Sequence, residues 1–373
     1  MKRAAGATRL PALVLALATA SLLTLPGSCR QNVEATPAAI DWLATAQDAD
    51  GLWHSRTYAM LRHGESTTAT LALALAQLPE PHRHKAEPLL LRALAGLATR
   101  RAPSPPVPPE PVDYPCFTAA HRLHALALRR PEGWRATADE LVAFLRRHQL
   151  GASNGWPADA PETGGFGLGA VEPRHPLGGD MVGLAAVAAV LQALVAADVP
   201  RDDTLFVQAR TFVQRCQCTD GGFRYAPVED WRGTKAGFAR DETGREVPRS
   251  HGTATCDGIL ALLALGERPI QPALARALAW LEHNAAATMP GLQHTTDPTL
   301  EPSMRLYWAE SLAAVARALP AHPRAATWQT FAVSIARERQ QRDGSFLGLA
   351  TTMKEDDPLV ATALALLATG ARD

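Results

Sequence analysis

The stretch RCQCTDGGFRYAP, Arg215 to Pro227, decides the fold because its Asp-Gly-Gly-Phe turn recurs along the chain. Related Gly-aromatic turns are DGLW at 50–53, GGF at 164–166 and DGSF at 343–346, separated by roughly 55 residues or about twice that distance. A weaker PGL at 290–292 fills the gap between the last two turns. A fixed period of this size is typical of repeat proteins, so the stretch is first of all one turn of a repeat.

Each turn separates two helical segments of different character. Segments before the turns, such as LFVQARTFVQRCQ at 205–217, are amphipathic, whereas segments after them, such as MVGLAAVAAVLQAL at 181–194, are apolar nearly all round. A helix with one apolar stripe lies at a surface, and a helix that is apolar all round is enclosed. The sequence therefore predicts six outer helices that alternate with six inner helices. We expect the inner helices to begin near His63, Cys116, Asp180, Thr253, Ser303 and Pro358.

This alternation builds either an open solenoid of helical hairpins or a closed double ring. An open solenoid would expose the inner helices on a concave face, and these segments carry too little charge for that position. A chain of 373 residues with 47% hydrophobic residues is large enough to bury an extensive core. We therefore predict an all-α fold, an α6/α6 toroid formed by one domain over residues 35–370.

Three stretches resemble the prenyltransferase and squalene oxidase repeats that squalene-hopene cyclases share with protein prenyltransferase β subunits. They are CQCTDGGFRYAP at 216–227, RSHGTATCDGILALLALG at 249–266 and EPSMRLYWAESLAAVARAL at 301–319. The likeness is closest to exported bacterial proteins of this superfamily, many of which have no assigned activity. It covers about residues 35–370 and implies an α6/α6 barrel with a central cavity. It is specific for the fold and weak for the chemistry.

Residues 1–29 are predicted to be an export signal. Lys2 and Arg3 precede an apolar run at 10–25 that is too short to be favoured as a membrane-spanning helix. LPGSC at 25–29 resembles a bacterial lipoprotein signal in which Cys29 is lipidated. Pro26 departs from the usual residue types there, so a secreted protein cut nearby remains the alternative. We expect an exported protein of the periplasm or cell envelope, which contacts the membrane through its N-terminal lipid if Cys29 is modified.

Charge and motifs exclude several classes of function. Lys plus Arg and Asp plus Glu are 37 each, so the chain lacks the basic excess that binding to nucleic acid requires. The sequence contains no Gly-rich phosphate loop and no GxSxG nucleophile motif.

Loop lengths indicate where a site belongs. All connections from an outer to the next inner helix lie at one end of the ring, which we call the long-loop rim; one of them, 219–250, has about thirty residues. The reverse connections, such as PEPHR at 79–83, form the short-loop rim. The polar candidates for a site at the long-loop rim are Tyr114, Cys116, Asp180, His251, Cys256, Asp257, Tyr307 and Asp356.

The ends of the inner helices suggest what this rim binds. Their N-termini converge on the long-loop rim, which favours an anionic or carbonyl group of a ligand whose apolar part lies in the barrel. The predicted partner is therefore an amphiphilic or anionic small molecule. The alternative is that the polar residues only cap helices, as expected for Asp357 before Pro358.

Two activities of the family are not expected. Squalene-hopene cyclases carry a DxDD motif whose protonated Asp starts the reaction, and the nearest stretch here, KEDD at 354–357, has Lys354 in the first position. A neighbouring lysine favours the ionised carboxylate, and the inner segments offer few aromatic faces to carbocations. Prenyltransferase β subunits bind zinc through a D-x-C pair, whereas this chain has Cys256 directly before Asp257. We therefore predict no metal and no cofactor.

The cysteines allow more than one interpretation. A disulfide from Cys216 or Cys218 to Cys256 would clamp the long loop, and free buried cysteines are a second possibility. A metal bound by these cysteines together with His251 and Asp257 is the third, although their spacing matches no compact metal-binding pair. The function predicted is an exported ligand-binding or scaffolding toroid. The alternatives are an enzyme that acts on an isoprenoid, lipid or polysaccharide at the long-loop rim, and a structural envelope protein.

Overall fold

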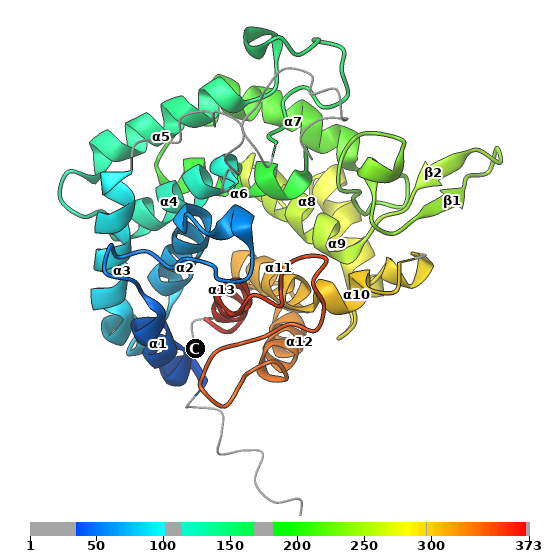
Figure 1. The fold of residues 1–373 in the computed structure, drawn as a ribbon. Helices are drawn as coiled ribbons and strands as arrows, with labels where there is room; N and C mark the ends of the chain where they lie inside the picture. Colours follow the sequence, from blue (N-terminus) through cyan, green and yellow to red (C-terminus); the bar gives the residue numbers. More distant parts are fainter. Residues whose placement is uncertain (1–34, 101–113, 168–181, 296, 371–373) are drawn as a thin grey trace, which may run out of the picture. The chain divides into compact units, whose positions relative to one another are not determined.

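The computed structural model describes residues 35–100, 114–167, 182–295 and 297–370, all of which belong to one compact unit (Figure 1). The outer helices are α1 (Ala35–Ala46), α3 (His82–Thr99), α5 (Trp134–His148), α7 (Thr204–Cys216), α9 (Pro272–Asn284) and α12 (Ala325–Arg337). The inner helices are α2 (Glu65–Gln77), α4 (Pro115–Arg129), α6 (Leu184–Ala196), α8 (Gly252–Ala264), α11 (Arg305–Ala318) and α13 (Pro358–Thr369).

The remaining elements are short and lie in the long loops. They are the helix α10 (Leu300–Ser303), the 3-10 turns at Ala59–Leu61, Ala152–Asn154, Trp231–Gly233 and Leu292–His294, and the strands β1 (Phe238–Arg240) and β2 (Glu246–Pro248). The two strands pair antiparallel in a hairpin that projects from the ring (Figure 1). No helix in the described ranges is both long and apolar enough to cross a bilayer.

The inner helices form a closed ring. Each contacts the next, from α2 through α4, α6, α8 and α11 to α13, and α13 returns to contact α2 (Figure 1). The predicted all-α toroid is therefore confirmed. Five inner helices begin within two residues of the expected positions, and α6 begins at Leu184 rather than near Asp180.

The apolar inner segments are enclosed on nearly all sides, as their pattern predicted. In α8, Thr253, Thr255 and Asp257 are buried together with every alanine of the helix. Alanine is small, so six inner helices approach one another closely around the axis. The long connections all join an outer helix to the next inner helix, which places them at one rim of the ring.

Four Gly-aromatic turns, which contain Gly51, Gly164, Gly221 and Gly344, each join a helical hairpin to the next outer helix. The first glycine of each turn has a positive φ, between +83° and +94°, where a side chain is strained. A Cβ at this glycine would also lie only 2.2–2.8 Å from a backbone oxygen of the neighbouring outer helix. The pairs are Gly51 with Arg92, Gly164 with Gln208, Gly221 with Arg276 and Gly344 with Ala38. The last pair joins the two ends of the ring.

A glutamine before each turn secures the same joint. Its side-chain Nε2 donates to the carbonyl of the turn glycine and to a carbonyl of the next outer helix. The glutamines with their second acceptors are Gln47 with Leu89, Gln149 with Leu205, Gln217 with Ala273 and Gln340 with Ala35. In three turns, an inner-helix threonine also accepts the N–H of the aromatic residue: Thr68 from Trp53, Thr255 from Phe223 and Thr362 from Phe346.

Candidate functional site

A cavity of about 1040 Å³ lies inside the inner ring, and all six inner helices line it. Its lining follows helical spacing, with Phe117, His121, His124 and Leu128 on α4 and Tyr307, Glu310, Ala314 and Arg317 on α11. Alanine and leucine provide most of the remaining wall. This size is at the upper end of small-molecule sites, which are roughly 300–1,000 Å³.

The cavity opens at the short-loop rim. Its exposed lining residues, which include Glu80, Leu128, Ala318 and Pro320, all lie at that end. The opposite end reaches the first turns of α4, α6 and α11, at Phe117, Ala185 and Tyr307, and none of the described long-loop residues lines the cavity. The described lining residues therefore place the mouth of the cavity at the short-loop rim, whereas the sequence predicts a ligand site at the long-loop rim.

Side chains from four long loops explain why the described cavity does not open at the long-loop rim. Lys354 Nζ lies 5.9 Å from the ring centroid of Tyr58 and 5.7 Å from that of Tyr114. Lys235 Nζ lies 4.4 Å from the ring centroid of Tyr225, which is itself buried. Cation–π contacts of this kind are favourable when partly desolvated. They draw the loops together next to the closed end of the cavity.

Asp257 and Tyr307 meet at this closed end. The Tyr307 hydroxyl donates to Asp257 Oδ2 at 2.7 Å, although the two residues lie on different helices. Burial raises the pKa of Asp257 from 3.8 to about 7; nearby Glu310 adds to the rise, whereas the Tyr307 hydrogen bond and Lys235 oppose it. Asp257 thus exchanges its proton near neutral pH, which is the property of a general acid or base.

A buried glutamate fixes the helix that carries Tyr307. Glu355 accepts the backbone N–H groups of Leu306 and Tyr307 at 3.0 and 2.8 Å, at the N-terminus of α11. Burial raises the pKa of Glu355 to about 8 despite these hydrogen bonds. Glu355 thus positions Tyr307 without lining the cavity itself.

Further polar side chains line the cavity between its ends. Burial raises the pKa of Glu310, one turn beyond Tyr307. Burial also lowers the pKa of His121 and of His124 to about 4, so both imidazoles are neutral at physiological pH. His121 Nδ1 lies 2.9 Å from Thr70 Oγ1. The cavity therefore presents uncharged hydrogen-bonding groups midway along an apolar wall.

Several sequence candidates lie away from the cavity. His251 is fully buried at the N-cap of α8, where its Nδ1 accepts the N–H of Ala254 at 3.4 Å. Cys116 and Cys256 are also fully buried, and Tyr114 directs its hydroxyl to the sulfur of Met60 at 3.7 Å. His251 therefore does not join Tyr307 at the cavity, and Asp257 is the partner of Tyr307 instead.

The acids of the KEDD stretch have structural partners. Asp356 accepts the Tyr58 hydroxyl at 2.5 Å. Asp357 caps α13 by accepting the N–H groups of Leu359 and Val360, as expected, and also accepts the Ser55 hydroxyl. Neither acid lines the cavity. Asp180 and Cys29 lie outside the described residues.

Sequence reasoning missed Glu310, Arg317, His121 and His124 as cavity residues. The available signal was their spacing: Tyr307, Glu310 and Arg317 stand three and seven residues apart and share one face of α11. His121 and His124 likewise stand three residues apart on α4, with Phe117 and Leu128 on the same face.

Metal and disulfide chemistry find no support in the described part of the chain. No group of three or more His, Cys, Asp or Glu side chains there is placed to hold a metal ion. Cys116, Cys216, Cys218 and Cys256 are free, so the clamp between the long loop and α8 is not formed. Burial raises the pKa of the Cys216 and Cys256 thiols, which makes them unreactive.

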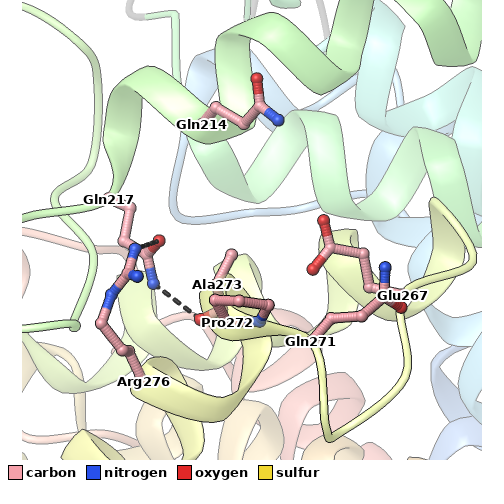
Figure 2. A pocket seen from close by; sticks show the side chains of 7 residues that line it. All are labelled: Gln214, Gln217, Glu267, Gln271, Pro272, Ala273 and Arg276. Atoms are coloured by element: carbon pink, nitrogen blue, oxygen red, sulfur yellow. Dashed lines mark hydrogen bonds between the residues drawn. The ribbon is translucent and has the colours of Figure 1, made fainter.

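A second pocket, of about 370 Å³, lies on the outside of the ring between α7 and α9 (Figure 2). Its polar groups already serve the repeat joint: Gln217 donates to the Ala273 carbonyl, and Arg276 donates to Gln217 at 2.9 Å. We therefore regard this pocket as part of the framework and the axial cavity as the candidate site.

No family model and no curated protein matches the sequence. Solved structures match the fold. Apo type II terpene cyclase MstE from Scytonema has a TM-score of 0.56 at 16% identity, over 91% of this chain and 97% of that one. An α-1,6-mannanase of Salegentibacter with bound mannotetrose has a TM-score of 0.53 at 9% identity, and the match covers 90% of this chain and 98% of the mannanase chain. A protein from Actinoplanes has a TM-score of 0.53 at 19% identity, and the match covers 91% of this chain and 99% of that protein. At these identities the likeness shows the fold alone, and the chain is an all-α toroid of the kind found in a terpene cyclase and a mannanase.

Proposed function

We propose that this protein binds a small amphiphilic molecule in its axial cavity. The observation that carries the proposal is the axial cavity of about 1040 Å³, in which Ala and Leu supply 15 of the 32 described lining residues and polar side chains lie among them. Sites for small ligands combine an apolar wall with a few placed polar groups in this way.

The closed end favours an uncharged polar group of the ligand. Asp257 brings a carboxyl group to this end and Glu310 brings another one turn farther along the cavity, so an anion of the ligand at this end would be repelled whenever either is ionised. The Asp257–Tyr307 pair suits a hydroxyl or carbonyl, which can exchange hydrogen bonds with both side chains. The helix N-termini had suggested an anion at this end, and the two carboxyl groups argue against it.

Filling the cavity should abolish binding. Ala189 lines the wall, and an Ala189→Trp side chain would occupy the space that a ligand needs. We expect the wild type to bind the apolar dye Nile red saturably, and Ala189→Trp to weaken this binding by at least about tenfold. Fluorescence titration measures both affinities.

The matched control is Ala279→Trp, which adds the same side chain at an exposed position of outer helix α9. This variant should bind the dye like the wild type. Dye binding that is not saturable, or that Ala189→Trp leaves intact, would show that the axial cavity is not the site.

A second candidate function, an enzyme on a lipid or isoprenoid, is favoured by one observation. Asp257 has a pKa near neutrality and hydrogen-bonds to Tyr307 in the apolar cavity, which suits a proton donor or acceptor for a bound substrate. A polysaccharide fits less well because Phe117 and Tyr307 are the only aromatic side chains among the described lining residues. Mass spectrometry of ligand recovered from the protein separates the functions: unaltered ligand supports binding, and product that is lost in Asp257→Asn supports catalysis.

We also propose that the protein is exported and attached to the membrane by a lipid on Cys29. The proposal rests on the LPGSC pattern at 25–29. Radiolabelled palmitate should be incorporated into the wild type and into Cys218→Ala, but not into Cys29→Ala. A soluble and unlabelled protein in the envelope fraction would leave export standing and remove the lipid anchor.

A further inference from the structure

We propose that the ligand carries a carboxylate and that Arg317, at the mouth of the cavity, receives it. The ligand then enters with its uncharged end first and retains its anionic end at the short-loop rim. This inference rests on the proposed binding function and specifies the chemistry of the ligand. It also reverses the orientation that the helix N-termini suggested.

Arg317 is a positive charge that faces the cavity. It lies in the last turn of α11, lines the cavity and donates from Nη1 to the Leu367 carbonyl at 2.6 Å. A guanidinium has five N–H donors and stays charged in proteins. In the described ranges no carboxylate lies within ion-pair distance of Arg317. Burial lowers the pKa of Arg317, and the carboxylate of Glu310, two turns away on the same face, partly offsets this lowering. A partly desolvated charge of this kind calls for an anionic partner.

The other two arginines of the cavity lining already have such partners. Arg83 pairs with Glu80 at 2.9 Å, and Arg129 pairs with Glu87. Arg317 therefore differs from them in forming no ion pair within the described ranges, so its guanidinium can receive the anionic group of a ligand. A planar guanidinium matches the two oxygens of a carboxylate, which makes this group the best fit.

The spacing of the polar groups specifies the rest of the ligand. Tyr307 and Arg317 are ten residues apart on one helix, which corresponds to about 15 Å along its axis. Ala314, Leu364 and Leu367 line the cavity between these levels. The geometry therefore fits an amphipathic acid with an apolar body of roughly 15 Å and a hydroxyl or carbonyl at the far end.

The alternative role for Arg317 is to cap the C-terminus of a neighbouring helix. Arg210 has that role elsewhere: its Nη2 donates to the Leu265 carbonyl at 2.9 Å at the end of α8, and Arg210 does not line the cavity. Arg210→Gln is therefore a matched control that loses an arginine–carbonyl contact without changing the cavity.

Calorimetric titration of the full chain tests the proposal with three probes: ω-hydroxydodecanoate, its methyl ester and dodecylammonium. We expect the wild type to bind the carboxylate about tenfold to hundredfold more tightly than the ester, the range for a hydrogen-bonded charge. Dodecylammonium should bind most weakly of the three. Arg317→Gln should lose the preference for the acid over the ester, whereas Arg210→Gln should keep it.

The outcomes distinguish failure of the carboxylate assignment from failure of cavity binding. Equal affinity of the wild type for acid and ester, with both blocked by Ala189→Trp, would refute the role of Arg317 and leave cavity binding intact. If no probe and no Nile red bound to the wild type, both proposals would be wrong. The comparison of acid with ester in the wild type needs no variant, so misfolding of Arg317→Gln cannot hide the result.

Discussion

Replacing Gly344 by valine is expected to lower the free energy of unfolding by about 2–5 kcal/mol, because the substitution disrupts the joint that closes the ring. Gly344 has a φ of +94°, and a Cβ there would lie 2.5 Å from the Ala38 carbonyl oxygen. The left-handed backbone costs a non-glycine residue about 1–2 kcal/mol. Overpacking against a rigid backbone adds about 1–3 kcal/mol, and a β-branched side chain cannot turn away from it.

Gly133→Val separates backbone strain from the closure contact. Gly133 has a similar φ of +72°, but a Cβ there meets nothing within 4 Å. This control should lose only the backbone cost of about 1–2 kcal/mol. Urea unfolding monitored by circular dichroism measures both changes. If the two variants lost equal stability, the contact between Gly344 and α1 would contribute nothing to closure.

The fold was predictable because sequence signals at several levels agree. The turns, the amphipathic outer segments and the apolar inner segments all repeat in step, and such agreement specifies one structure. The glutamines that secure the joints were not recognised. Gln217, for example, stands at the end of an amphipathic helix, where a polar residue is expected to face water. Only the three-dimensional structure shows that its amide reaches two carbonyls of different segments.

The site was predicted only in part, because it depends on helix rotation and on loops that are distant in sequence. Asp257 and Tyr307 were both named as candidates, but their contact joins residues fifty positions apart. Cys256 is next to Asp257 in sequence, yet it points elsewhere because successive helix residues are rotated by about 100°. Which rim is open depends on side chains such as Lys354 and Tyr58, which meet from opposite ends of the chain.

The Asp257→Asn variant should become progressively more stable than the wild type as the pH rises from about 4 to 7. The folded protein holds a proton on Asp257 up to a pKa of about 7, whereas the unfolded chain releases it near the ordinary value of 3.8. The favourable contribution of this proton is therefore complete below pH 3.8 and is lost as the pH rises through 7. Between these two pKa values, the free energy of unfolding of the wild type falls relative to that of Asp257→Asn by at most about 1.4 kcal/mol per pH unit. Asparagine keeps an acceptor for the Tyr307 hydroxyl and cannot ionise.

Chemical denaturation at a series of pH values measures the difference in unfolding free energy between Asp257→Asn and the wild type. This difference also includes the effect of the Asp257 charge on the titration of Glu310, Lys235 and Tyr225, which interact with it electrostatically. Asp203→Asn is a control of opposite sign, since the hydrogen bond from Arg146 lowers the pKa of Asp203. The stability that ionised Asp203 contributes is lost only as the pH falls below 3.8. The difference in unfolding free energy between Asp203→Asn and the wild type should therefore stay constant between about pH 5 and 8, which is roughly the range of maximal stability. Parallel curves for Asp257→Asn and the wild type would mean that Asp257 is already ionised in the folded protein. A carboxylate that holds no proton near pH 7 could not serve as the general acid of an enzyme, and only the role of a general base would remain for Asp257 in catalysis.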